Sequence, residues 1–201
     1  MEFRSFLLLA FCLLLPVSGA TSDLSPEELV RDTSSRMLIA LKEEKAVIEE
    51  DKSRIYALVS DIVLPYFDFR RMAMWALGRY WRNADADQRE RFVSEFREML
   101  VRTYGIALAD YSDETIVYLP LHAEQGDRDV TVRTEIEQAG GPAIQITYSM
   151  YLTTNGWKVY DVSINGVSLV TNYRTTFASI IRKDGMDSLI RQLANRNGPS
   201  S

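Results

Sequence analysis

The sequence predicts an α+β fold in which one antiparallel sheet is flanked by N-terminal and C-terminal helices. Residues 25–111 repeat apolar side chains at spacings of three and four, which is the helical period. Residues 115–164 change to a period of two, which is typical of half-buried strands, and the helical period returns after residue 168. This order of elements, with helices first, about four strands next and helices last, favours one antiparallel sheet with helices packed on it.

The first twenty residues have the pattern of a secretory signal peptide. Arg4 supplies a positive charge, an apolar run extends from Phe6 to Leu15, and small residues at 18–20 form a cleavage site. We therefore expect residues 1–20 to be removed and residues 21–201 to form a single domain in the periplasm. The apolar run is about half of the roughly 20 residues that span a bilayer, so no membrane anchor is expected.

Cysteine and histidine usage argues against a metal centre and against nucleophilic catalysis. Cys12 is the only cysteine, and it lies within the apolar run after bulky Phe11, which disfavours lipid modification. Cleavage after Ala20 leaves no thiol for a disulfide, a metal or a nucleophile. The only histidine, His122, lies in a predicted loop without a nucleophile motif. No cofactor is therefore predicted.

The formal net charge is −5, and 46% of the residues are hydrophobic, which suits one globular domain with a core. An acidic chain lacks the dominant basic surface that nucleic-acid binding requires, so no nucleic-acid partner is predicted. No strongly apolar surface patch is left over, which favours a monomer. Positive charge gathers at Arg70, Arg71, Arg79 and Arg82. A solvated face is the simplest interpretation, with a phosphate, a membrane surface or an acidic partner as alternatives.

Capping residues and a proline set the first predicted helices. Ser25 with Glu28 forms a capping box, which predicts a helix that runs through Ile48. A second apolar period, over residues 55–62, predicts a helix that Pro65 ends.

Further caps predict a short helix and then the longest one. Asp68 begins a short helix that Gly78 stops. Asp85 with Gln88 opens the longest helix, whose aromatic-rich face continues to Tyr111.

Two Asn-Gly pairs predict turns in the strand region. Asn155-Gly156 predicts a type I′ hairpin, because both central positions of that turn need positive φ. In that register Leu152 faces Val159 and Met150 faces Asp161. Both sheet faces then carry apolar residues, so either the sheet is covered on both sides or a bulge shifts the register.

The second Asn-Gly pair lies inside the stretch from Trp157 to Phe177. Asn165-Gly166 is predicted to turn the last strand directly into a helix that Ser168 caps. Gly185 is predicted to separate that helix from the last one.

Several segments spread through most of the chain together form a family pattern. They are Leu64–Phe69, Ala76–Trp81, Gln88-Arg89 with Phe92, Phe96-Arg97, Thr103-Tyr104 with Leu108, and Trp157–Leu169. In this order, and behind a signal peptide, they resemble the MlaC family of periplasmic phospholipid carriers, also called the toluene-tolerance auxiliary family. The resemblance implies a fold similar to nuclear-transport-factor-2-like proteins, with an apolar cavity for acyl chains and no catalytic activity.

The resemblance also implies partners and a cargo. Family members are thought to shuttle phospholipid between an outer-membrane lipoprotein associated with porins and an inner-membrane ABC transporter with a mammalian-cell-entry-domain subunit, which maintains outer-membrane lipid asymmetry. Val167 is carried over as a contact with the outer-membrane partner, near the cavity mouth. The candidate lipid-lining residues are Tyr80, Trp81, Phe96, Leu100, Tyr104, Ile146, Tyr148, Met150, Val159 and Val162.

Two other functions stay open at this point. Asp161 is the one acid among apolar strand positions, and it could serve as the general base of an enzyme on a similar fold. A structural carboxylate, hydrogen-bonded to backbone or tyrosine groups, is the simpler interpretation. A periplasmic adaptor without ligand is the third hypothesis, since an apolar helix stripe is in most proteins simply core.

Overall fold

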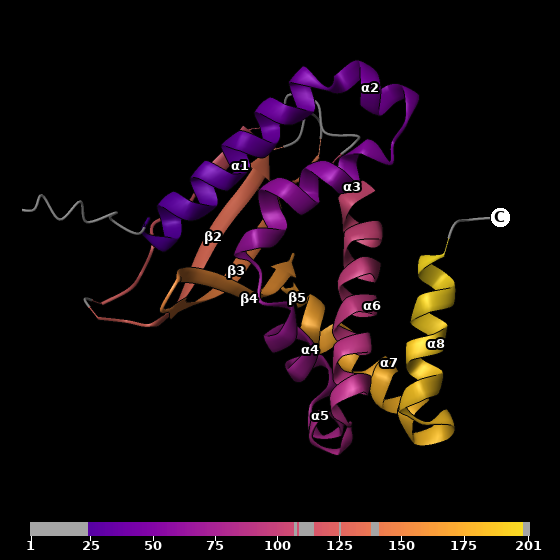
Figure 1. The fold of residues 1–201 in the computed structure, drawn as a ribbon. Helices are drawn as coiled ribbons and strands as arrows, with labels where there is room; N and C mark the ends of the chain where they lie inside the picture. Colours follow the sequence, from indigo (N-terminus) through magenta and orange to yellow (C-terminus); the bar gives the residue numbers. More distant parts are fainter. Residues whose placement is uncertain (1–23, 107, 109–114, 125, 138–140, 199–201) are drawn as a thin grey trace, which may run out of the picture.

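The computed structural model describes residues 24–106, 108, 115–124, 126–137 and 141–198, so the predicted signal peptide lies outside the described residues. Those ranges contain no helix with the length and apolar character needed to cross a bilayer. The fold is α+β, as predicted (Figure 1). The elements in chain order are α1 (Pro26–Glu43), α2 (Lys45–Glu50), α3 (Arg54–Leu58), η1 (Val59–Val63), η2 (Leu64–Tyr66), α4 (Phe69–Leu77), α5 (Arg79–Asn83), α6 (Ala86–Gly105), β1 (Thr115–Tyr118), β2 (Asp129–Glu137), β3 (Ile144–Thr153), β4 (Gly156–Ile164), β5 (Val167–Ser168), α7 (Leu169–Asp184) and α8 (Met186–Asn197).

The predicted helix caps are present. The Ser25 hydroxyl accepts the backbone N–H of Glu28 at 3.3 Å, and the Glu28 carboxylate accepts the N–H of Ser25 at 2.9 Å. Asp85 and Gln88 form the same reciprocal pair at the start of α6. The Asp68 carboxylate accepts an N–H group in the first turn of α4. Each cap satisfies donors that a helix N-terminus leaves free.

Two helices are shorter than predicted. α1 ends at Glu43, and Ile48 belongs to the separate helix α2, because the backbone leaves the helical region at Glu44 with φ −100° and ψ 12°. The apolar period hides this break, because residues of both helices pack into one hydrophobic cluster. α6 ends at Gly105, and Tyr111, its predicted last member, lies outside the described residues.

Five strands form one antiparallel sheet in the order β1-β2-β3-β4-β5, where about four were predicted; the two-residue β5 is the addition. In the observed register Val132 lies opposite Tyr148, and Tyr148 lies opposite Val162, so these three side chains share one face. We call this the inner face. Its members are Val130, Val132, Thr134 and Ile136 of β2, Ile144, Ile146, Tyr148 and Met150 of β3, and Val159, Val162 and Ile164 of β4.

The prediction of a type I′ turn with Asn155 and Gly156 at its centre is wrong. Thr153 pairs with Gly156, so the two turn residues are 154 and 155, and Gly156 itself takes the positive φ of 91°. A bulge at Ser149/Met150 then shifts the register. The turn at residues 154 and 155 already places Met150 opposite Val159 rather than Asp161, and beyond the bulge Tyr148 lies opposite Val162, so the apolar residues of β3 and β4 stay on the inner face.

The second Asn-Gly pair closes a hairpin instead of leading directly into a helix. Asn165 and Gly166 both have positive φ, 48° and 80°, and Ile164 pairs with Val167 across the turn. The side-chain oxygen of Asn165 accepts the N–H of Gln145 at 3.0 Å, which ties the turn to β3. Ser168 then caps α7 as predicted, and Gly185 separates α7 from α8.

Two hydrophobic clusters hold the fold together. The larger one joins the inner face of the sheet to the start of α1 and to α4, α6, α7 and α8. The smaller one joins α1, α2, α3 and η1 to α6 through Val101. Figure 1 shows α1 lying along β2, with α2 and α3 at one end of the molecule and α4, α5 and α7 at the other. The two clusters leave unfilled space where they meet the sheet.

Candidate functional site

An apolar cavity of about 520 Å³ lies between the helices and the inner face of the sheet. Residues of both hydrophobic clusters border it, Val59 from the smaller one and Met72 from the larger. The volume lies within the range of about 300–1,000 Å³ that is typical of ligand pockets. The lining residues are Val59, Val63, Leu64, Phe67, Phe69, Met72, Leu100, Val101, Tyr104, Gly105, Leu108, Ile136, Ile144, Ile146, Tyr148, Val162, Ile164 and Leu169.

A smaller cavity of about 200 Å³ lies between α1 and the inner face of the sheet. Leu29 and Met37 of α1 form one wall, and Met150 and Val159 form the other. The two cavities are immediate neighbours, because they share the wall residues Val63, Phe67, Leu108, Ile136, Ile146 and Tyr148.

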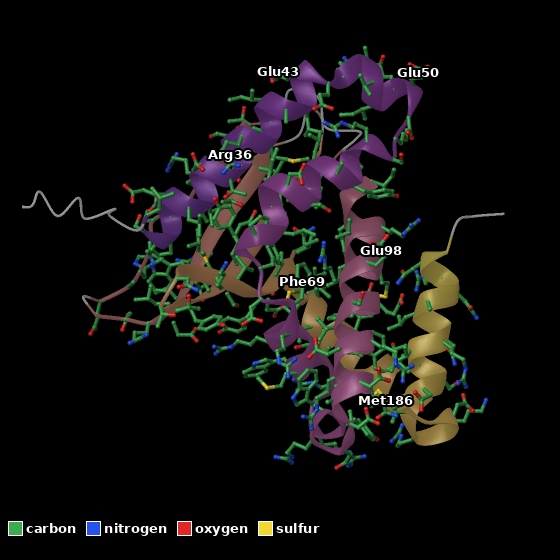
Figure 2. The ribbon with its side chains drawn as sticks, in the orientation of Figure 1. Arg36, Glu43, Glu50, Phe69, Glu98 and Met186 are labelled. Carbon is green, nitrogen blue, oxygen red and sulfur yellow. The ribbon has the colours of Figure 1, made fainter. Side chains whose placement is uncertain are left out.

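Local structure explains how the walls are placed. Strand alternation puts Ile144, Ile146 and Tyr148 on the inner face, one after another. The chain is extended at Phe67, and α4 then starts at Phe69, so these two rings stack with centroids 5.8 Å apart. Figure 2 shows Phe69 at the start of α4, in the middle of the molecule.

Among the residues that line the larger cavity, Tyr104 and Tyr148 are the ones with a polar side-chain group, a hydroxyl in each case. Burial and a hydrogen bond with Tyr173 raise the pKa of Tyr104 to about 12. Burial also raises the pKa of Tyr148, whose hydroxyl has a hydrogen-bond partner in Thr134. Both hydroxyls are therefore neutral at physiological pH, and no lining residue of the larger cavity carries a charge. Such a wall suits a hydrocarbon chain and disfavours a charged group.

Seven of the ten predicted lining residues border a cavity. Leu100, Tyr104 and Val162 line the larger one, Met150 and Val159 line the smaller one, and the remaining two border both. Those two are Ile146 and Tyr148.

Phe96 does not border either cavity. Phe96 is 0% exposed. The centroid of its ring lies 5.5 Å from the ring centroids of Phe92 and Phe177, and 5.7 Å from that of Tyr173. This part of α6 packs against α7, so the aromatic stripe is core there.

Tyr80 and Trp81 also lie away from the cavities, on α5. The Tyr80 hydroxyl accepts a hydrogen bond from Arg79 at 2.9 Å, and the Arg70 guanidinium lies 5.3 Å from the Trp81 ring. Both rings are partly buried against the larger hydrophobic cluster and lie beside arginines, and neither is among the residues that line the two cavities.

Several wall residues were not predicted from the sequence. The segment from η1 to Phe67 contributes Val59, Val63 and Leu64. Val59 belongs to the apolar period predicted over residues 55–62, but π-helical and 3-10 turns then replace the α-helical ones, so that period does not assign Val63 and Leu64 to a face. Ile144 and Ile164 also line the larger cavity, and strand alternation was the signal that could have found them.

Asp161 supports the start of α7. Its register opposite Ser149 places it on the outer face of the sheet, away from the cavities. The Ser168 hydroxyl donates to one carboxylate oxygen at 2.6 Å, and the N–H of Val170 donates to the other at 3.2 Å. These partners agree with the structural interpretation, since both oxygens are engaged.

Replacing Asp161 with asparagine is expected to lower the free energy of unfolding by about 1–2 kcal/mol, because one acceptor and the negative charge are lost. Urea denaturation followed by circular dichroism measures this change. The capacity of the cavities for a ligand should stay the same, because the side chain points to the outer face of the sheet and borders neither cavity. Unchanged stability would contradict the structural role.

Val167 is exposed beside the cavity wall. It lies on β5 with 56% of its surface exposed, it pairs with Ile164, and it precedes Leu169 by two positions. Ile164 and Leu169 both line the larger cavity.

Comparison with known proteins agrees with this geometry. Residues 31–195 match the family model of the MlaC protein. A curated relative is the intermembrane phospholipid transport system binding protein MlaC of Haemophilus influenzae, 29% identical over 193 residues, which are 94% of this chain and 88% of the relative. Another is the toluene tolerance protein ttg2D of Pseudomonas putida, 28% identical over 181 residues, with 90% and 82% covered.

A solved structure also resembles this fold closely. The phospholipid-binding protein of Ralstonia solanacearum, solved in complex with a phospholipid, has a TM-score of 0.81 and 31% sequence identity. The match covers 87% of this chain and 97% of that protein. It confirms the predicted fold class. Because the family model spans most of the sequence, the chain belongs to the MlaC family.

Proposed function

We propose that this protein binds a phospholipid with its acyl chains in the two neighbouring cavities and carries it through the periplasm. The observation that carries the proposal is the larger cavity, about 520 Å³ and bordered by no charged side chain. Each methylene group gains about 0.8 kcal/mol when it leaves water, so two acyl chains gain on the order of 20 kcal/mol. An apolar cavity of this kind replaces the bilayer during transfer.

The comparisons support phospholipid as the cargo. The Ralstonia solanacearum protein was solved with a phospholipid, and the Haemophilus influenzae relative is named for intermembrane phospholipid transport. We infer that the headgroup stays outside the cavity, in water, because an uncharged lining would not offset its loss of hydration. The cargo needs no cofactor and leaves the protein chemically unchanged.

The proposal extends to location and partners. The signal-peptide pattern at residues 1–20 supports export to the periplasm. The carrier acts as a monomer and exchanges phospholipid with an outer-membrane lipoprotein–porin complex and an inner-membrane ABC transporter that has a mammalian-cell-entry-domain subunit. Val167 contacts the outer-membrane complex, because it is apolar, exposed and beside the wall residues Ile164 and Leu169.

Native mass spectrometry of the protein purified from the periplasm of its own organism tests the cargo. The expected spectrum shows one phospholipid on most molecules. A ligand-free adaptor, the alternative function, would appear as the bare chain under the same conditions. An empty protein would therefore overturn the carrier function.

A further inference from the structure

The corner between α4 and α5 exposes arginines beside large apolar side chains. Residues 69–84 contain four arginines, two methionines and two tryptophans, and no aspartate, glutamate or lysine, in a chain of net charge −5. Figure 1 shows this corner at the end of the molecule opposite α2. The segment therefore differs in composition from the acidic chain around it.

Two large apolar side chains of α4 are exposed at this corner, and one of them is held in place. Met74 is 41% exposed and Trp75 is 46% exposed. The Trp75 ring stacks on Tyr160 with centroids 6.2 Å apart, and its backbone carbonyl accepts two N–H groups of Arg174, at 2.9 and 2.6 Å. A ring that is already ordered loses little entropy on binding a partner.

Three cations at the corner are not neutralised. Arg70 pairs with Glu90, but within the described part of the chain no carboxylate forms an ion pair with Arg79, Arg82 or Arg174. Arg174 reaches the corner itself, since its Nε lies 3.8 Å from the position a Cβ would take on Gly78. The charge of Arg174 therefore stands next to the exposed Trp75, and Arg79 and Arg82 follow on the next helix, α5.

We propose that the α4–α5 surface, formed by Met74, Trp75, Arg79, Arg82 and Arg174, docks an acidic face of a partner protein. Arginine, methionine and aromatic residues are enriched in the cores of protein interfaces, whereas lysine and acidic residues are depleted. Arginine pairs with carboxylates through two parallel hydrogen bonds.

Charge complementarity selects the partner and its orientation. The carrier is acidic overall, so an acidic partner is repelled by most of the molecule and attracted to this corner. An anionic membrane is flat and extends beyond this corner, so it would also face the acidic remainder of the chain, whereas an acidic protein face can match the corner alone. The inference rests on the proposed function, because it takes the partner to be one of the two membrane complexes that exchange lipid with the carrier.

The test measures binding of the lipid-loaded full chain to each membrane complex in nanodiscs of zwitterionic lipid. The variant R79E/R82E is expected to bind at least one complex about tenfold more weakly at low salt, with a difference that shrinks as salt rises. The control R133E/R196E makes the same charge change at exposed positions on β2 and α8, and it should bind as the unmodified chain does.

Two further variants keep the test decisive if the double variant folds poorly. Arg82→Glu alone changes a side chain without a described contact, and Trp75→Ala removes the exposed ring; each is expected to weaken binding severalfold. Equal binding of R79E/R82E and the unmodified chain to both complexes would overturn the proposal. Tight binding to protein-free phosphatidylglycerol vesicles that R79E/R82E abolishes would also overturn it, in favour of a membrane surface.

The outcome is separable from the carrier function. Native mass spectrometry of the same samples reports phospholipid content, which R79E/R82E should leave unchanged because neither arginine borders a cavity. If the unmodified chain binds neither complex, the docking surface and the proposed partners fail together while the cargo result still stands. If the chain is empty but binds a complex through this corner, the docking surface stands without the cargo.

Discussion

The Ile146→Trp variant is expected to lose about nine-tenths or more of its phospholipid. Ile146 borders both cavities, so an indole ring at this position would occupy space on both sides of their shared wall. Each excluded methylene weakens binding by about 0.8 kcal/mol, and two excluded methylenes already exceed a tenfold change in affinity. Native mass spectrometry gives the ratio of phospholipid to protein directly.

Thr147→Trp is the matched control for this variant. Thr147 is the next residue on β3, and its register opposite Arg133 and Ser163 places it on the outer face of the sheet. The control should keep its phospholipid, and both variants should show cooperative thermal unfolding. If Ile146→Trp binds as much phospholipid as Thr147→Trp, the cargo does not occupy these cavities.

The Val167→Glu variant is expected to transfer phospholipid to the outer-membrane complex about tenfold more slowly while it keeps a normal cargo. A buried carboxylate without a partner is costly at an apolar contact, so docking is weakened. Val167 is not a wall residue of either cavity, so binding of the lipid itself is unaffected. Transfer of deuterated phospholipid from the loaded carrier to the purified complex measures the rate.

Val47→Glu on α2 controls for the added charge, because Val47 is 50% exposed and α2 lies at one end of the molecule, away from β5 (Figure 1). Its transfer rate should match that of the unmodified chain. An unchanged rate in Val167→Glu would eliminate Val167 as a docking contact. Loss of cargo from Val167→Glu would instead assign the residue to lipid binding.

Neighbouring positions on α6 show how far periodicity predicts a site. Phe96 and Leu100 are one helical turn apart on the same apolar stripe, and both are buried. Phe96 is enclosed by other aromatic rings, whereas Leu100 borders the larger cavity. An apolar position reads the same in the sequence whether its neighbour is a side chain or an empty space, so periodicity cannot separate core from cavity wall.

The two Asn-Gly pairs show a similar limit for turns. Both dipeptides satisfy the local requirement of a type I′ turn, but only Asn165-Gly166 has positive φ at both positions. Asn165 is held there by its hydrogen bonds with Gln145 on β3. At Asn155-Gly156 the pairing of β3 with β4, including its bulge, decides the turn. The two dipeptides are equal candidates for a type I′ turn in the sequence, and contacts between strands determine which of them forms it.

The sequence by itself determined the order of helices and strands, the helix starts at Ser25, Asp68, Asp85 and Ser168, and the family. Helix caps and the alternation of apolar and polar residues in strands depend on residues within a few positions of one another, so they can be recognised from the sequence alone. Only the tertiary structure decided where the protein is hollow. The larger cavity is bordered by residues from Val59 to Leu169, and it exists because two separately packed hydrophobic clusters stop short of filling the space over the inner face of the sheet.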